Sequence, residues 1–385
     1  MAKKKIIRLV LALILLIIVF YGVYLGWIKK DMSDFGVPYK NALRIMRGET
    51  PYRVTDGHLQ FKYAPISAFF YFPLTLLPYD MAKVVWYYLE IVFLYFIFVL
   101  SYKVLPDKRK RPWFVAGISF LVMLKFIGRE FELGQVNTFI ILVLMLMLSA
   151  ALKKKDAAVG VFWALSVFFK PYALIFFPYF ILKRRWKALA VGAGVLLAGL
   201  ALPSVVFGVR GNLHVLAQWG QTLSRSTPGL MTVGDNASLY AFFWKILPGQ
   251  SAALAEALWI ASGFLLAAVL VWMMLAAKTR AVAVPELLEM SFLFVLIPLF
   301  SPLGWYYNYF YAVPAVAIIM NYWPVFPRGW KYLVVIDLLL IGGTLREVLG
   351  KRLFRFYTGM HLVAVNFLVI VAVLIYMRLN KRARV

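Results

Sequence analysis

The sequence predicts an all-α polytopic membrane protein with about 12 transmembrane helices (11–13). Its 385 residues are 63% hydrophobic and have a mean hydropathy of +0.82, whereas soluble domains are nearer half apolar. Apolar runs of about 16 to 25 residues recur along the whole chain, which is typical of membrane-spanning helices. Cys is absent, so disulfides, thiolate nucleophiles and thiolate metal sites are excluded.

The distribution of the basic residues behind the net charge of +26 determines the expected topology. The basic residues form short clusters between apolar runs: Lys3–Lys5, Lys108–Arg111, Lys153–Lys155, Lys183–Arg185, Lys278 with Arg280, and Lys381, Arg382 and Arg384. Clusters close to span ends face the cytoplasm and suit an anionic leaflet. We therefore expect cytoplasmic termini, contacts with membrane lipids and no nucleic-acid partner.

Each element follows from keeping those clusters inside. The first span, 6–27, is too long for a cleaved signal peptide and has no cleavage site after it, so it is retained. The segment 28–81 then stays outside, and its apolar part, 61–79, contains three prolines and is expected in the outer interface. The next spans are expected at 82–105, 113–128 and 138–152. Two short helices then meet near Lys170–Pro171, and single spans follow at 188–208 and 252–277. A pair of spans meets outside at 301–309, and a final pair of spans follows it.

The remaining organisation is simple. The segment 209–250 is expected as a second outer loop. We find no internal repeat and no soluble domain, so residues 1–385 are expected to form a single integral-membrane domain. Its oligomeric state stays open.

The segment after the first span predicts a short amphipathic helix on the outer surface. Its apolar positions recur at helical spacing: Tyr39, Leu43 and Met46. A cap at Asp34 is disfavoured because Pro38 has no N–H to bond the Asp34 carbonyl, so a start at Gly36 or Val37 is expected. Asp34 is then either free for chemistry or a loop cap or solvated carboxylate.

Polar residues gather on the outer side of this topology. They include more than half of the acidic residues: Asp31, Asp34, Glu49, Asp56, Asp80, Glu130, Glu132, Asp235 and Glu347. With them fall Arg129, Gln135, Asn137, Lys170, Asn236, Trp305–Asn308, Arg346, Lys351, Arg352 and Arg355. The cytoplasmic loops are short and mostly basic, so any chemistry is expected to face away from the cytoplasm.

Seven short motifs occur in an order that resembles glycosyltransferase family 87, the polyprenol-phosphate-mannose-dependent α-mannosyltransferases of the GT-C fold. They are DMSDFGVPY (31–39), GETPY (48–52), FKYAPISAFFYFPL (61–74), GQVN (134–137), FKPY (169–172), DNASL (235–239) and SPLGWYYNY (301–309). The resemblance covers about residues 28–310. The last two spans carry no matching motif.

The resemblance implies a membrane glycosyltransferase with its active site on the outer face of the cytoplasmic membrane. It would move a hexose, expected to be mannose, from a polyprenyl-phosphate sugar to an acceptor hydroxyl, with inversion. The acceptor would be a lipid or a glycan. Because the donor already carries its leaving phosphate, no nucleotide site is required, and the sequence has neither a P-loop nor Rossmann glycines.

The family's general base corresponds to Asp34, with Asp31 as a supporting residue. An Asp of ordinary pKa, near 3.9, is ionised outside the cell. Within about 2.6–3.2 Å of the acceptor hydroxyl, it can accept the proton that is lost as the new bond forms. Its charge also stabilises oxocarbenium character.

Cations are needed for the donor phosphate, and four are candidates. Lys170 and Arg129 lie at the outer interface in apolar settings, although side chains that snorkel to the surface would look the same. Arg346 and Lys351 are expected outside, where they would bind the donor phosphate or an anionic lipid acceptor. A misplaced last hairpin is the alternative for this second pair.

Candidates for binding the sugar or the acceptor are uncharged polar and aromatic residues: Tyr39, Tyr63, Gln135, Asn137, Asn236, Trp305, Tyr307 and Asn308. Helix capping by the amides and an interfacial aromatic belt are the competing interpretations. Mycobacterial family members often have His where this sequence has Tyr307 and Asn308, which leaves the acceptor open.

No cofactor or metal is expected, because the three histidines show no metal-ligand spacing. Two other functions compete with mannose transfer. One is another GT-C transferase that moves arabinose, glucose or a modified sugar. The other is a lipid or sugar transporter or flippase, which would predict related halves and polar residues running to both faces.

Overall fold

The computed structural model describes residues 2–276 and 284–380, and within them every regular element is helical. The predicted all-α class is therefore confirmed. The α-helices are α1 (Ala2–Gly26), α2 (Ser33–Met46), α3 (Phe72–Thr75), α4 (Tyr79–Lys103), α5 (Pro112–Leu133), α6 (Asn137–Leu152), α7 (Asp156–Phe169), α8 (Phe176–Leu182), α9 (Trp186–Ala201), α10 (Ser204–Ser226), α11 (Leu239–Ile246), α12 (Ala252–Ala276), α13 (Pro285–Phe300), α14 (Val313–Asn321), α15 (Arg328–Gly343), α16 (Arg346–Gly359) and α17 (Val363–Leu379). The topology-setting residues Lys278, Arg280, Lys381, Arg382 and Arg384 lie outside the described residues.

Several of these helices have the length and apolarity of membrane spans. Helices α4 and α12 are each long and apolar enough to cross a membrane. The number of such spans reaches 4 if two bent helix pairs, α9 with α10 (95°) and α16 with α17 (74°), each count as one span. Shorter apolar helices add to them: Ile14–Gly26, α6, α7 and Pro171–Leu182. The chain is thus a membrane protein of several apolar helices, while the crossing number of 12 stays a prediction.

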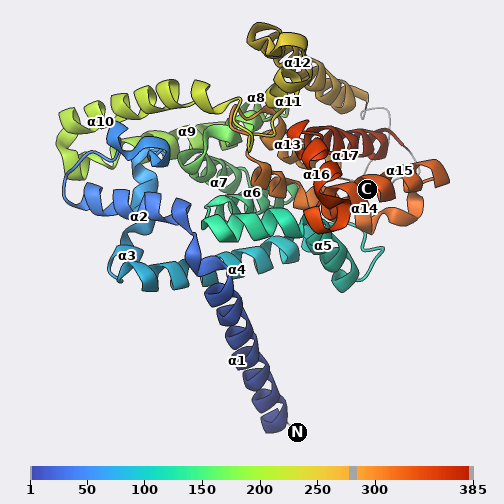
Figure 1. The fold of residues 1–385 in the computed structure, drawn as a ribbon, viewed down its shortest axis with the longest axis horizontal. Helices are drawn as coiled ribbons and strands as arrows, with labels where there is room; N and C mark the ends of the chain where they lie inside the picture. Colours follow the sequence, from blue (N-terminus) through green and yellow to red (C-terminus); the bar gives the residue numbers. More distant parts are fainter. Residues whose placement is uncertain (1, 277–283, 381–385) are drawn as a thin grey trace.

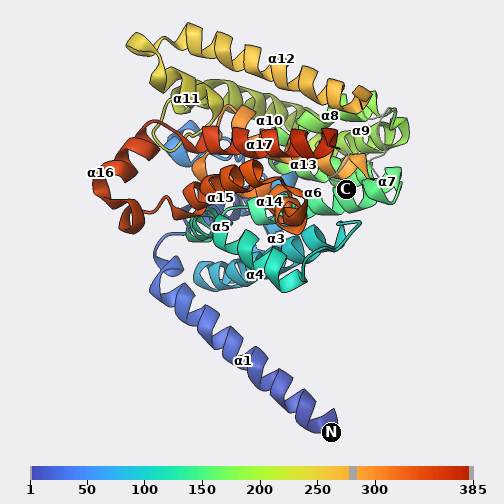
Figure 2. The same cartoon turned by 90° about the vertical axis from the view of Figure 1, so that its right-hand side faces the viewer.

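Helix α1 projects away from the body of the molecule, as Figure 1 shows. Large apolar side chains between Ile14 and Leu25 are mostly exposed along it, as expected of a helix that faces lipid on most sides. Two α4 hydroxyls tie it to the body: Tyr88 donates to the Ile17 carbonyl at 2.9 Å and Tyr87 to the Phe20 carbonyl at 3.2 Å. In Figure 2 both termini lie toward the right-hand side and α16 lies at the left.

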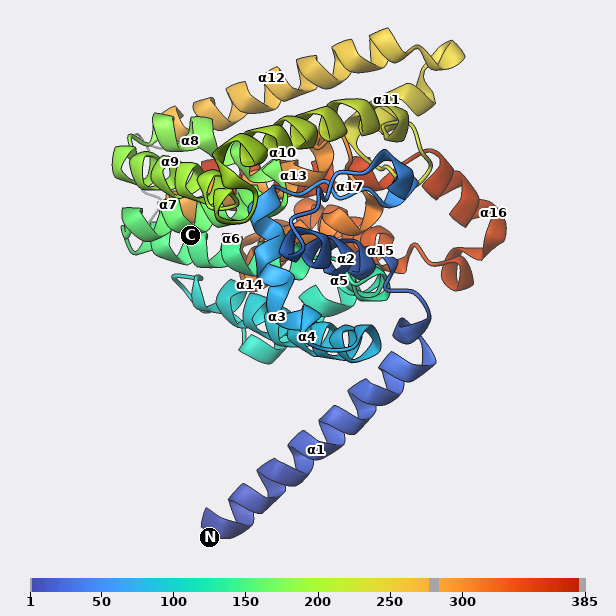
Figure 3. The ribbon, with the colours of Figure 1, turned by 90° about the vertical axis from the view of Figure 1, so that its left-hand side faces the viewer.

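The expected spans before the site correspond to helices. Residues 82–105 form most of α4, 113–128 lie in α5 and 138–152 lie in α6. The apolar stretch 61–79 forms a 3-10 helix, η3 (Pro65–Tyr71), and the single turn α3. Figure 3 shows α2, α3 and α10 on one side of the molecule, where α2 packs on both α3 and η3.

The two short helices expected around Lys170 are α7 and α8. Lys170 itself has extended backbone angles (φ −142, ψ 120), and the 3-10 helix η4 (Pro171–Ile175) follows it. Pro171 has no N–H to continue α7, which explains the break. The chain therefore reverses at Lys170 and leaves its amine inside the helix bundle.

The start of α2 differs from the prediction, which placed it at Gly36 or Val37. The helix begins at Ser33, so Asp34 lies in its first turn and Pro38 lies inside it. Met32 adopts left-handed angles (φ 50), and its N–H bonds the Glu132 carbonyl at 2.7 Å. This bond to a residue far along the chain sets the helix start, and the carboxylate sits at the positive end of the helix dipole.

The segment 209–250, which was expected to be an outer loop, is largely helical. Helix α10 runs through Ser226, and α11 follows. Val215 and Trp219 recur at helical spacing; Val215 is buried, and the Trp219 indole N–H donates to the Lys62 carbonyl at 3.0 Å. Because the segment is polar in composition, its sequence predicted a loop and this helical periodicity was missed. Helix α16 is likewise a separate element between α15 and α17, bent at Gly350 (φ 70).

A buried ion-pair cluster joins α8, α13 and α17. Glu289, fully buried on α13, lies 2.6 Å from the Lys183 ammonium and 3.2 Å from the Arg378 guanidinium, and accepts from the Tyr179 hydroxyl at 3.0 Å. Removing one member of such a cluster leaves the opposite charges buried and unpaired.

Glu289→Ala is therefore expected to lower the free energy of unfolding by about 3–5 kcal/mol, measured by SDS titration of the helical circular dichroism signal. Glu286→Ala is the matched control on the same helix, because the Glu286 carboxylate is 29% exposed and 4.0 Å from Arg185. Its effect is expected to stay within about 0.5 kcal/mol. Equal effects of the two variants would contradict this account of the cluster.

Candidate active site

A cavity of about 1400 Å³ collects side chains from segments far apart in the sequence. Its walls come from the start of α2, the segment before η3, the second half of α5, the Lys170 turn, the end of α10, the loop before α11, the 301–307 loop and α16. The charged, polar and aromatic lining residues include Asp34, Lys62, Tyr63, Lys125, Arg129, Gln135, Lys170, Asp235, Trp305, Tyr306 and Tyr307.

Asp34 is held by the amide of Gln135. The Gln135 Nε2 donates to Asp34 Oδ2 and also to the Tyr307 hydroxyl at 3.1 Å. Gly134, which ends α5 with φ +65, makes this possible, since a Cβ there would lie 2.8 Å from the Phe35 Cβ. The glycine lets the end of α5 pack against the first turn of α2, and this contact places the amide beside the carboxylate.

Lys170 extends the same network away from Asp34. Its Nζ donates to Asn137 Oδ1 at 2.8 Å and to Gln135 Oε1 at 3.4 Å. Asn137 Nδ2 in turn donates to Glu130 Oε2 at 2.8 Å, and the Tyr311 hydroxyl donates to Asn137 Oδ1 at 3.0 Å. Hydrogen bonds thus connect the buried acid Glu130 to the cavity carboxylate through two amides and one ammonium.

Burial changes the acidity of both charged groups. It raises the pKa of Asp34, while the hydrogen bond from Gln135 and the charge of Lys170 act in the opposite direction. Burial also lowers the pKa of Lys170 to about 8, against the opposing charges of Glu130 and Asp34. At neutral pH this leaves a cation beside a carboxylate whose proton affinity is higher than usual.

The structure brings about half of the predicted site residues to the cavity. Asp34, Tyr63, Arg129, Gln135, Lys170, Trp305 and Tyr307 line it. Asp31 lies next to it: its carboxylate is 3.8 Å from the Arg129 guanidinium and accepts from the Ser33 N–H at 3.3 Å.

Four predicted binding residues support the walls instead. The Tyr39 hydroxyl donates to the Leu77 carbonyl at 2.8 Å, and Asn137 lies behind Lys170. Asn236 donates to the Pro302 carbonyl at 2.8 Å and pairs its backbone with Trp305, while Asn308 donates to the Leu303 carbonyl at 3.2 Å. These amides and this hydroxyl bond backbone carbonyls or network partners.

The two predicted phosphate cations near the C-terminus lie apart from the cavity lining. Arg346 and Lys351 are on α16, but the α16 side chains that line the cavity are Phe354, Tyr357 and Thr358. The bend at Gly350 separates Arg346 from these three, whereas Lys351 follows the bend and is exposed.

Two lysines of the cavity wall were missed in the sequence. Lys62 lies within the FKYAP stretch, and its burial lowers its pKa while the charge of Asp34 raises it. Lys125 lies in the middle of an apolar span. Its signal was available, because an ionisable residue inside a predicted span is a site candidate by default.

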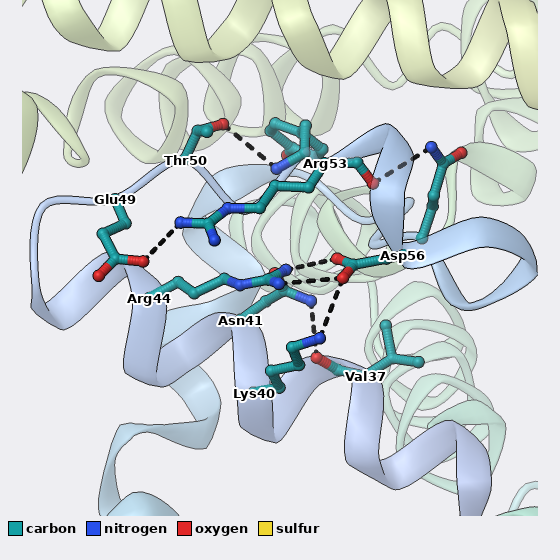
Figure 4. A network of polar contacts seen from close by, with 10 residues as sticks. Val37, Lys40, Asn41, Arg44, Glu49, Thr50, Arg53 and Asp56 are labelled. Atoms are coloured by element: carbon teal, nitrogen blue, oxygen red, sulfur yellow. Dashed lines mark hydrogen bonds and ion pairs between the residues drawn. The ribbon is translucent and has the colours of Figure 1, made fainter.

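A salt-bridge network fixes the loop that supplies His58, Leu59 and Gln60 to the cavity wall (Figure 4). Arg44 on α2 binds the Asp56 carboxylate with both terminal nitrogens, one of them at 2.9 Å, and Lys40 adds a bond at 3.0 Å. The Arg44 guanidinium lowers the pKa of Asp56. Thus α2 carries Asp34 at its start and holds this loop through its middle turns.

The fold and the site together define a membrane-embedded enzyme with a carboxylate, cations and aromatic side chains facing one large cavity. The family model of glycosyltransferase family 87 matches residues 61–302, and the chain belongs to this family. It is therefore a glycosyltransferase, as the motifs predicted. Gln135 and Lys170 lie within the match; Asp34 precedes it and joins it through the Gln135 hydrogen bond.

One curated relative is the polyprenol-phosphate-mannose-dependent α-(1-2)-phosphatidylinositol pentamannoside mannosyltransferase of Mycolicibacterium smegmatis (strain ATCC 700084 / mc(2)155). It is 25% identical over 155 residues, which cover 40% of this chain and 37% of the relative. The match thus spans little more than a third of the relative's length. No solved structure matches the chain.

Proposed function

We propose that this glycosyltransferase moves a hexose, with mannose as the first candidate, from a polyprenyl-phosphate sugar to an acceptor hydroxyl. The acceptor is a lipid or a glycan at the outer face of the cytoplasmic membrane. The observation that carries the proposal is the Asp34 carboxylate in the wall of a 1400 Å³ cavity, held by Gln135 and facing the cation Lys170. The relative's dependence on polyprenol-phosphate-mannose supports this choice of donor.

In the proposed reaction Asp34 accepts the proton of the acceptor hydroxyl as its oxygen bonds the anomeric carbon. The bond from that carbon to the phosphate oxygen breaks on the opposite face, its electron pair leaves with the phosphate, and the configuration inverts. Lys170 and Lys62, whose charges both act on Asp34, would stabilise the charge that grows on the leaving phosphate.

Gln135 is a positioning residue in this scheme. It bonds the base, Tyr307 and Lys170 at once, so it fixes the carboxylate relative to the cation. Tyr63, Trp305 and Tyr307 offer ring faces to a sugar or an isoprenoid from the cavity wall. We also propose that the chain crosses the membrane 12 times with both termini in the cytoplasm. This arrangement puts the C-terminal end of α5, which packs beside Asp34, on the outer side.

The donor is tested by incubating the purified full chain with membrane lipid extract and one labelled donor at a time: polyprenyl-phosphate mannose, polyprenyl-phosphate glucose, or a nucleotide sugar. We expect labelled product from a polyprenyl-phosphate hexose and none from the nucleotide sugar. Transfer from the nucleotide sugar alone would contradict the proposal. A preference for the glucose donor would support the proposed reaction but contradict mannose as the sugar transferred.

The pH profile of transfer gives an independent test of Asp34 as base. The carboxylate must be ionised to accept a proton, so kcat/KM is expected to fall as pH drops through the raised pKa of Asp34. Gln135→Ala removes a hydrogen bond that favours the ionised form, so the pKa of Asp34 rises further and the acidic limb moves to higher pH.

Tyr307→Phe is the matched control for this shift, because it removes the other partner of the Gln135 Nε2 and leaves the bond to Asp34 in place. Its acidic limb is expected to stay near that of the wild type. An acidic limb in Gln135→Ala that does not move, or moves to lower pH, would count against Asp34 as the titrating base.

A further inference from the structure

Lys125 lines the cavity wall, and no carboxylate within residues 2–276 and 284–380 pairs with its ammonium group. Its Nζ is buried without a hydrogen-bond partner among the residues described. Its nearest aromatic neighbours are the rings of Phe126 and Tyr306, with centroids at 5.0 and 5.1 Å. Cation–π contacts recover only part of the cost of burying an ammonium group.

Two other cations of this wall, Arg129 and Lys170, are already compensated. Arg129, one helical turn further along α5, lies 2.8 Å from the Glu132 carboxylate. Lys170 is bonded to Asn137 and Gln135 and balanced by Glu130. Lys125 therefore differs from both, since the side chains that neutralise its neighbours do not reach it.

Its position is also distinct from that of the proposed base. Asp34 lies beside Gly134 at the end of α5, and Lys125 lies about 14 Å back along the helix axis at a rise of 1.5 Å per residue. The charges of Lys170, Asp31 and Arg129 act on Asp34, as does that of Lys62. An anion bound at Lys125 would thus occupy a separate part of the same cavity.

The surroundings of Lys125 suit a phosphate group. The Tyr306 ring borders it, and Tyr357 of α16 lies near Tyr306 and also lines the cavity. An uncompensated ammonium between membrane helices is the chemistry that binds lipid phosphates. Because α5 carries it within the predicted span 113–128, a membrane lipid whose headgroup enters the cavity can present its phosphate to Lys125.

We propose that Lys125 forms a second anion site in the cavity, which binds the phosphate group of a membrane lipid. The site itself follows from the unpaired cation; the source of the phosphate rests on the proposed function. Because the proposed reaction places the leaving phosphate of the donor at Lys170 and Lys62, the source that fits both sites is the phosphate of an anionic lipid that serves as acceptor, and a polyprenyl phosphate is the alternative that the test distinguishes.

The test measures lipid binding to the purified full chain by native mass spectrometry. The probes are undecaprenyl phosphate and phosphatidylglycerol, with phosphatidylcholine as the neutral reference. We expect Lys125→Met to weaken binding of at least one anionic probe about tenfold or more, and Lys125→Arg to retain it. Lys103→Met, which removes an exposed cation from the end of α4, is expected to bind as the wild type does.

The pattern of losses identifies the source. Loss of undecaprenyl phosphate alone assigns the site to the donor, loss of phosphatidylglycerol alone assigns it to an acceptor lipid, and loss of both shows a site for either phosphate. Unchanged binding of both probes by Lys125→Met overturns the proposal.

Folding is checked in the same samples by thermal unfolding. Because Lys125 lacks a counter-ion, Lys125→Met is expected to unfold no earlier than the wild type without lipid, and to lose the stabilisation that an anionic lipid gives the wild type. Failure of the proposed function would look different: the wild type would bind phosphate through Lys125 and still transfer no hexose from a polyprenyl phosphate.

Discussion

Asp34→Asn is expected to lower the rate of sugar transfer about 10³-fold or more. A positioned general base contributes about 10²- to 10⁴-fold, and the substitution also removes a charge that stabilises the oxocarbenium-like transition state. Asn has nearly the same shape and can still accept from Gln135 Nε2. The loss is therefore expected in kcat, with expression, membrane insertion and thermal stability retained. The measurement is single-turnover transfer of a labelled hexose by the purified variant.

Asp80→Asn is the matched control for this prediction. Asp80 is also an acidic residue after the first span, but it is exposed at the start of α4 and does not line the cavity. Its transfer rate is expected within about twofold of the wild type, as for other surface changes. If purified Asp34→Asn kept a rate within tenfold of the wild type, Asp34 would not be the base.

Lys170→Met is expected to have the second largest effect, for two physical reasons. It removes the ammonium that faces the leaving phosphate, and loss of one such electrostatic group typically costs about 10²- to 10³-fold in kcat. It also leaves Glu130, which is fully buried, without its cation, and this is expected to lower the free energy of unfolding by about 3–5 kcal/mol. Transfer and thermal unfolding are measured together.

A double variant separates the two effects. Lys170→Met combined with Glu130→Gln removes the unpaired buried charge, so stability is expected to recover while transfer stays low. Lys170→Arg keeps the charge and is expected to retain part of the activity. Recovery of transfer together with stability in the double variant would show that Lys170 has only a structural role.

The sequence predicted the helices better than the connections between them. Apolar runs are sufficient to locate α4, α5 and α6, because lipid requires continuous hydrogen-bonded helices. The start of α2 was misplaced because the bond from Met32 to the Glu132 carbonyl joins segments that local pattern cannot relate. Helix α10 was missed because its apolar stripe is narrow and lies within a polar composition.

In the candidate site, too, the sequence located individual residues better than the contacts between them. Asp34, Gln135 and Lys170 were singled out from separate motifs, and the structure brings them into one hydrogen-bonded network. Asn236 and Asn308 resemble sugar-binding amides in sequence, yet they bond backbone carbonyls. Residue type alone does not distinguish an amide that binds a ligand from one that satisfies buried backbone.

The proposed reaction is inverting transfer from a polyprenyl-phosphate hexose with Asp34 as base. It is tested most directly by the anomeric configuration of the product, determined by NMR for purified protein supplied with a polyprenyl-phosphate hexose of known configuration. We predict that the wild-type protein forms a product whose anomeric configuration is opposite to that of the donor, and that Asp34→Asn forms no product. A product of retained configuration, or the same yield from Asp34→Asn, would contradict the account.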